Sequence, residues 1–235
     1  MCSMVLSMYF SYDEKETEYL KSKCKKLAFI IDEIGHIERE ADKDLFSAVV
    51  HHIVAQQIST KAQATIWQRI ETSLGAVNAD TILSVKAEGL RPLGVSYRKA
   101  EYIMDFANKV KNGVFNLDAI LQKTDEDAIR ELSSLKGVGV WTAEMLLLFC
   151  MQRKNIFSYD DLAIQRGIRM VYHHKKITRP LFEKYRKRFS PYCSVASLYF
   201  WAVSGGAIKG MKDYAPVLPK KEGKKNVASK KTIKA

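Results

Sequence analysis

Two glycines, Gly137 and Gly139, lie one residue apart in the segment LKGVGVWTA, which spans Leu135–Ala143. Because glycine lacks a Cβ, this pair permits the backbone angles that a tight turn needs. A helical pattern resumes at Val140. The first turn of a helix presents free amides and the positive end of its dipole, which together can bind a phosphate. A lone G-x-G before a helix is, however, more often a plain turn between two helices.

Two adjacent acids, Asp160 and Asp161, open the next helical stretch. An aspartate at a helix start is most often an N-cap, whose side chain accepts a backbone N–H. A carboxylate in a dry cleft can also stabilise the positive charge that builds on a sugar when its glycosidic bond breaks, and it can position or deprotonate water. From its position alone, the capping role is the simpler one for Asp161.

Helical spacing of apolar residues dominates the chain and strict two-residue alternation is absent, so the sequence predicts an all-α fold. Leu45–Ala55 is apolar almost all round, as expected of a central helix, and Val140–Met151 has the pattern of a buried helix. Capping residues Ser59, Ser96 and Thr124 mark the starts of three more helices. Helices of average length would number roughly ten.

The chain carries 38 Lys and Arg residues against 26 Asp and Glu residues, a formal net charge of +12. This balance favours a polyanionic partner, most often nucleic acid. Seven of the lysines lie in residues 219–235, a polar tail whose composition predicts disorder, so the rest of the chain is only moderately basic. No apolar run is long enough to span a bilayer and no signal peptide is evident, so we expect no membrane association. The four cysteines lack metal-site spacing and are expected to be free thiols.

A hairpin, a buried helix and an aspartate at the next helix start, in this order, resemble the helix-hairpin-helix (HhH-GPD) superfamily of DNA glycosylases. Two upstream stretches, IVAQQIS (Ile53–Ser59) and GVSYRKAEY (Gly94–Tyr102), resemble its 3-methyladenine DNA glycosylase II branch, in a short form without the extra N-terminal β domain. The resemblance covers roughly Glu16–Gly206. The chain departs from the family where Ser158-Tyr159 replaces the usual proline-containing loop.

The resemblance implies two helical subdomains with an active-site cleft between them. Residues 45–150 would form a helical barrel that contains the hairpin, at about 135–143. Residues 1–44 and 151–218 would form the second subdomain, followed by the tail.

By the same resemblance, Asp161 is the catalytic carboxylate and Asp160 a cap or an exposed neighbour. Members that also cut the DNA strand carry a lysine two residues after the second hairpin glycine, and this lysine forms a Schiff base. Trp141 occupies that position here. The resemblance therefore implies base release without lyase activity, which leaves an abasic site.

The base pocket is expected to be aromatic and apolar, with Trp141, Met145 and Tyr192 in its wall. Tyr192 belongs to the stretch PYCS (Pro191–Ser194), which matches a Trp-Arg-Ser motif of relatives but lacks its guanidinium. Trp201 is expected to be a core aromatic. An electron-rich pocket favours a cationic base by cation–π attraction, and no general acid is evident in the motifs. These features suit alkylated purines, 3-methyladenine and 7-methylguanine.

Residues expected to bind DNA lie in two loops and at one helix start. The turn Gln56, Gln57 and Ile58 matches the place where relatives carry a wedge that fills the gap left by a flipped base, although a plain polar loop explains Gln57 equally well. The other expected contacts are Gly137, Val138, Gly139 and Val140 of the hairpin, and Ser194.

No cofactor is expected to be required. Relatives often hold a monovalent cation, Na⁺ or K⁺, on hairpin carbonyls, which here would be those of Ser133, Leu135 and Val138. The expected partner is double-stranded DNA with a damaged base, bound by a monomer, in the cytoplasm or nucleoid of a bacterium or the nucleus of a eukaryote. Two alternatives stay open: a non-catalytic HhH protein that binds DNA or lesions, and a glycosylase for a deaminated or adducted base.

Overall fold

The computed structural model describes residues 9–42 and 44–216, and within them it contains twelve α-helices and no β-strand, only one isolated bridge between Tyr9 and Glu40. The all-α prediction is confirmed. There are more helices than expected because several are short; α7 has only five residues. The predicted disordered tail, residues 219–235, lies outside the described residues. The helices are α1 (Glu14–Lys23), α2 (Lys25–Ile34), α3 (Leu45–Ala55), α4 (Thr60–Leu74), α5 (Ala79–Leu90), α6 (Tyr97–Lys111), α7 (Leu117–Leu121), α8 (Asp125–Leu132), α9 (Val140–Phe149), α10 (Leu162–Tyr172), α11 (Arg179–Phe189) and α12 (Cys193–Ser204).

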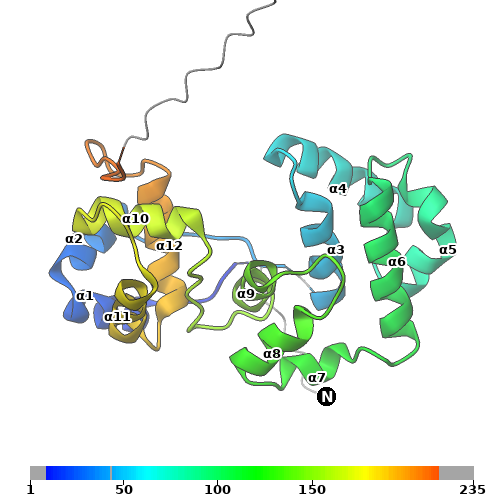
Figure 1. The fold of residues 1–235 in the computed structure, drawn as a ribbon, viewed down its shortest axis with the longest axis horizontal. Helices are drawn as coiled ribbons and strands as arrows, with labels where there is room; N and C mark the ends of the chain where they lie inside the picture. The colour runs from blue at the N-terminus through cyan, green and yellow to red at the C-terminus, as the bar shows by residue number, and fades with distance from the viewer. Residues whose placement is uncertain (1–8, 43, 217–235) are drawn as a thin grey trace, which may run out of the picture.

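The helices form two groups (Figure 1). The first contains α1, α2, α10, α11 and α12, and the second contains α3 to α8 with α9 packed against α3 and α8. The chain crosses to the second group between α2 and α3 and returns between α9 and α10. The predicted subdomain boundaries, 44/45 and 150/151, stay predictions; α3 begins at Leu45 and α9 ends at Phe149. None of the helices in the described residues is long and apolar enough to cross a bilayer.

Capping side chains fix where most of the helices begin. The hydroxyls of Ser59, Ser96 and Thr124 each accept the backbone N–H three residues on, at 3.2, 3.4 and 3.2 Å, as predicted. The helix α9 differs, because its N-cap is Gly139 and no side chain caps it. The first amides of α9 therefore stay available to another acceptor.

A glycine allows two helices of the first group to touch backbone to backbone. Figure 1 shows α10 crossing α12, and the two helices are in contact. At Gly167 of α10, a Cβ would lie far inside van der Waals distance of the Phe200 carbonyl group on α12. This close approach fixes the position of Trp201, the next residue of α12, relative to the start of α10.

Gly167→Ala should therefore destabilise the fold by about 1–3 kcal/mol, because the new methyl group forces α10 away from α12. The control is Gly205→Ala, at a position with ordinary helical φ of −77° and with room for a Cβ at 3.4 Å from its nearest neighbours. The measurement is the urea midpoint of each variant. Equal midpoints would contradict the close packing.

Candidate active site

The Asp161 carboxylate lies where the two groups of helices meet. It is the N-cap of α10 and only 7% exposed. Its Oδ1 accepts the backbone N–H of Ile164 at 2.8 Å and the indole N–H of Trp201 at 3.1 Å. Its Oδ2 accepts the indole N–H of Trp141 at 3.0 Å. Three N–H donors from α9, α10 and α12 thus fix both oxygens of one buried carboxylate.

Capping and a role in chemistry are compatible at Asp161. The cap hydrogen bond uses Oδ1, while Oδ2 accepts only the Trp141 N–H and keeps a free lone pair. Asp160 is exposed and caps no helix, so of its two predicted roles the exposed neighbour is confirmed and the cap is wrong.

Trp201 is a site residue that the sequence interpretation missed. The expectation of a core aromatic is confirmed, because the half-buried ring packs against the core and stacks on Phe149, with ring centroids 5.5 Å apart. The indole N–H also donates to Asp161, which the sequence did not reveal. A buried tryptophan N–H usually finds an acceptor, and this was the one signal available in the sequence. Trp141 is 42% exposed, so one part of its ring stays open beside the carboxylate.

The two remaining pocket predictions are Met145 and Tyr192. Met145 is buried and lies one turn after Trp141, on the same face of α9. Its contact with a base stays a prediction. Tyr192 precedes α12, nine residues before Trp201, which is roughly 13 Å along a helix axis at 1.5 Å per residue, and its place in the base pocket also stays a prediction. Its ring packs edge-on against Tyr19 of α1. Trp201, near the end of α12, is the residue of this helix that contacts Asp161.

The burial of Ser194 contradicts its predicted contact with DNA. Its side chain is fully buried. The hydroxyl accepts the backbone N–H of Ile156 at 2.9 Å and donates to the carbonyl of Arg153 at 2.5 Å. Ser194 therefore fastens the crossing segment after α9 to the start of α12.

The hairpin has the geometry that its glycines predict. Gly137 has φ of +84°, and a Cβ there would collide with the ring of Tyr102 on α6. Val138 is buried, so only its backbone faces outward, whereas Val140 is half exposed. The uncapped amides of α9 follow directly after Gly139. The expected phosphate site is thus built from backbone, with Tyr102 packed behind it.

The loop after α3 is tied to the hairpin. The side-chain amide of Gln56 donates to the Gly137 carbonyl at 2.5 Å, so Gln56 bridges the two loops, and its contact with DNA stays a prediction. The ammonium group of Lys99 donates to the carbonyls of Val54 and Gln56, at 2.8 and 2.7 Å. Gln57 is exposed with φ of +57°, and Ile58 is half-buried behind it. Lys99 is a second residue that sequence reasoning missed, although it lies in the quoted Gly94–Tyr102 motif.

The predicted cation site lies between α8 and α9. The Leu135 carbonyl already accepts the Val138 N–H at 3.0 Å, which still leaves one lone pair, and the Ser133 hydroxyl oxygen is buried without a hydrogen-bond partner. An ion held on backbone carbonyls would fit these residues, and it stays a prediction. Within the described residues, no cluster of three His, Cys, Asp or Glu residues could hold a metal, and Cys24, Cys150 and Cys193 are free thiols, as predicted.

A second contact from α9 holds the loop that carries Asp161. Ser158 is buried and its hydroxyl donates to the carboxylate of Glu144, one turn after Trp141. Burial raises the pKa of Glu144, although the Ser158 hydrogen bond opposes this effect. Trp141 and Glu144 thus hold both ends of the loop 158–161. Sequence reasoning noted the Ser158-Tyr159 departure but did not find this contact.

A protein-family model described as "HhH-GPD superfamily base excision DNA repair protein" matches residues 50–191, more than half of the chain. The chain belongs to this superfamily. It is 27% identical to YfjP of Bacillus subtilis over 184 residues, which are 74% of the chain and 64% of YfjP. The chain thus spans just under two thirds of the length of that relative.

Two solved structures have the same fold. The DNA-3-methyladenine glycosidase of Bacillus halodurans matches with a TM-score of 0.77 and 30% identity, over 88% of this chain and 96% of that one. The 3-methyladenine DNA glycosylase Mag1 of Schizosaccharomyces pombe, in complex with abasic DNA, matches with a TM-score of 0.72 and 24% identity, over 81% and 97%. The predicted membership of the HhH-GPD superfamily and its 3-methyladenine branch is confirmed.

Glu144→Gln should leave the fold as stable as the natural chain or make it more stable, because the amide oxygen still accepts from Ser158 and no buried charge remains. Because the pKa of Glu144 is raised in the folded protein, the fold loses stability as the pH rises above 4.5, the ordinary pKa of a glutamate. The advantage of Gln should therefore grow from pH 4 to pH 8. Urea titrations at both pH values measure it.

Glu144→Ala is the matched variant. It leaves the buried Ser158 hydroxyl without an acceptor and should lower stability by about 1–2 kcal/mol at either pH. If Ala and Gln behave alike, the hydrogen bond does not hold the loop.

Proposed function

We propose that this chain is a monofunctional DNA glycosylase that hydrolyses the N-glycosidic bond of alkylated purines, 3-methyladenine and 7-methylguanine, in duplex DNA. The observation that carries the proposal is the buried Asp161 carboxylate, fixed by two indole N–H groups beside the exposed face of Trp141. Family membership and the Bacillus halodurans glycosidase support it.

The negative charge of Asp161 would promote cleavage of the glycosidic bond. Breaking the bond between base and sugar builds positive charge on the sugar, and a fixed carboxylate in a site of low dielectric stabilises that charge. Because the Asp161 oxygens are already oriented, little reorganisation is needed as the charge develops. The lone pair left on Oδ2 can accept a proton from water that attacks the sugar.

The aromatic surroundings suit a cationic base. A purine alkylated at a ring nitrogen carries positive charge, so its glycosidic bond is weakened and little general-acid help is needed. The open part of the Trp141 ring offers a cation–π contact. Val140 and Leu162, which follow the hairpin and Asp161, are 50% and 77% exposed, so the site presents apolar surface that a nucleotide would cover.

The proposal includes no lyase step. A Schiff base needs a nucleophilic amine, and the indole of Trp141 has none. The product is therefore an abasic site in an intact strand.

Gln57 serves as the wedge in this proposal. A base can reach Asp161 only after it leaves the stack, and a side chain that fills the gap makes this less costly. Gln57 extends from a loop that Lys99 and Gln56 hold rigidly against the hairpin. The uncapped amides of α9 then bind a phosphate of the same strand.

Asp161→Asn should abolish base release, by at least about 100-fold, because the negative charge is lost. Folding should survive with a loss of about 1–3 kcal/mol. Asparagine still caps α10 through its oxygen, but its NH2 group faces the Trp141 indole N–H, which loses its acceptor. The control is Asp160→Asn, which should keep full activity. Purified protein is incubated with methylated duplex DNA, and free bases and strand breaks are measured before any alkali treatment.

Three outcomes would overturn the proposal or part of it. DNA binding without base release would favour the lesion-binding alternative. Release of deaminated or adducted bases, and not of methylated purines, would favour the other glycosylase. Strand breaks without alkali would contradict the role of Trp141.

Gln57→Ala should lower the kcat/KM of base release from duplex DNA roughly tenfold, a loss of about 1.4 kcal/mol. Its effect on single-stranded DNA should be small, because no stack has to be opened there. Gln68→Ala, on the exposed face of α4, is the control. An equal loss on both substrates would show that Gln57 acts in some way other than as a wedge.

A further inference from the structure

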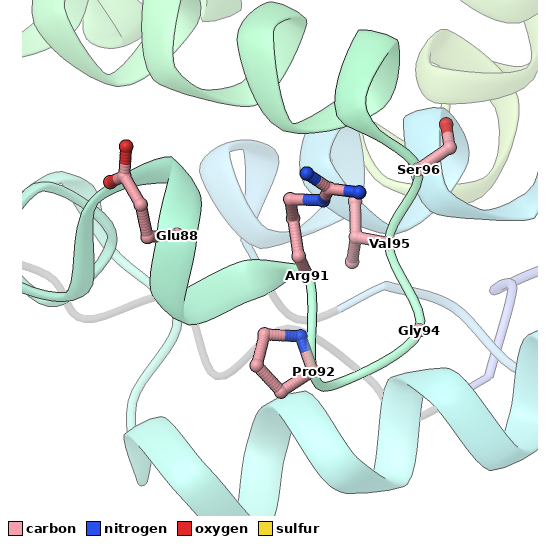
Figure 2. A pocket seen from close by; sticks show the side chains of 6 residues that line it. All are labelled: Glu88, Arg91, Pro92, Gly94, Val95 and Ser96. Atoms are coloured by element: carbon pink, nitrogen blue, oxygen red, sulfur yellow. The ribbon is translucent and has the colours of Figure 1, made fainter.

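Two adjoining hollows lie beside the Gln57 loop. Figure 2 shows the first, between the end of α5 and the start of α6. The second lies along α4. The first is lined by Glu88, Arg91, Pro92, Gly94, Val95 and Ser96. The second is lined by Ser59, Lys61, Ala62, Thr65, Ile66 and Arg69.

A shared wall joins the two hollows. A Cβ on Gly94 would lie 2.9 Å from Cγ1 of Ile66 and 3.9 Å from Nη1 of Arg69. The Arg69 guanidinium group therefore lies at the boundary between them. The absence of a Cβ at Gly94 lets Ile66 of α4 pack against the backbone of the first hollow.

The cations of these hollows have no acidic partners. Lys61, Arg69 and Arg91 are exposed, and none has a carboxylate within 4.0 Å in the described part of the chain, unlike Lys111 or Arg130. Glu88 is the only acid in the linings, and Figure 2 shows its carboxylate away from the Arg91 guanidinium. The charges are thus available to an external anion.

The direction of the helices adds to the positive potential. The first residues of α4 and α6 adjoin the hollows, since their N-caps, Ser59 and Ser96, are lining residues. The Arg91 guanidinium group lies over the ring of Tyr97, 5.8 Å from its centroid, and that ring is 59% exposed. A sugar can pack on such a ring while the cation contacts the phosphate.

We propose that Lys61, Arg69 and Arg91 form a second phosphate-binding surface, separate from the α9 hairpin, that holds the DNA backbone beyond the wedge. Lys61 and Arg69 are eight residues apart on α4, roughly 12 Å, which is the rise of three to four base-pair steps. The surface begins four residues after Gln57, so a duplex opened at Gln57 would run onto it. This inference rests on the proposed function in that its ligand is duplex DNA.

The test compares two double variants of equal charge. Arg69→Gln with Arg91→Gln removes two cations of the surface. Lys187→Gln with Arg188→Gln removes two exposed cations of α11, in the other group of helices (Figure 1), which likewise have no carboxylate within 4.0 Å among the described residues; Arg188 lies over the ring of Tyr185. Binding to undamaged and abasic duplexes is measured from 50 to 200 mM salt.

Each lost phosphate contact should reduce the slope of log K against log salt by about one. We expect a reduction of about two for the first pair and little change for the α11 pair. Arg69→Lys with Arg91→Lys should restore the slope. In the Gln pair, the stretch of DNA that the protein protects from hydroxyl radicals should become shorter at one of its two ends.

An unchanged slope, or an equal loss in the α11 pair, would overturn the proposal and leave an acidic protein as the remaining occupant. The binding slope can be read whether or not the chain releases bases. A failure of the proposed function and a failure of this surface are therefore distinguishable.

Discussion

The hydrogen bonds of one buried carboxylate connect the two groups of helices. A charge removed from water is unfavourable unless donors replace the lost hydration, and Asp161 has three: the Ile164 amide and the two indoles of Trp141 and Trp201. These donors come from α9, α10 and α12. Because α9 packs with the second group of helices and the other two belong to the first, the same hydrogen bonds that satisfy the carboxylate also join the groups. Folding and the site depend on one set of contacts.

Other contacts keep this arrangement rigid. Gly167 lets α12 approach α10 closely enough for Trp201 to reach the helix start. Glu144 and Ser158 hold the loop before Asp161, and Lys99 fixes the loop after α3 through two carbonyls. None of these side chains needs to touch a substrate. Each limits how far a reacting group can move, which is where much of the catalytic advantage of a preorganised site arises.

Local signals were readable from the sequence and long-range ones were not. Caps, the central helix Leu45–Ala55 and the hairpin turn depend on residues within a few positions, so type and spacing were enough. Tyr192 and Ser194 were assigned by matching a motif to the start of α12. The start of α12 is buried within the first group of helices, and its position depends on how α12 crosses α10. Trp201 was missed for the same reason, since its partner lies forty residues away.

The distribution of charge reconciles two opposite demands. A polyanion must be attracted, yet the bond to be broken needs negative charge beside it. Asp161 is buried at the junction of the helix groups, so it acts strongly over a few ångströms. Across water its field is screened within a Debye length of about 8–10 Å. Cations such as Arg69 and Arg91 lie in the open, where a phosphate can reach them. Under the proposed function, burial thus separates the two fields: the surface attracts the DNA backbone, and the carboxylate acts only on a nucleotide that has left the helix.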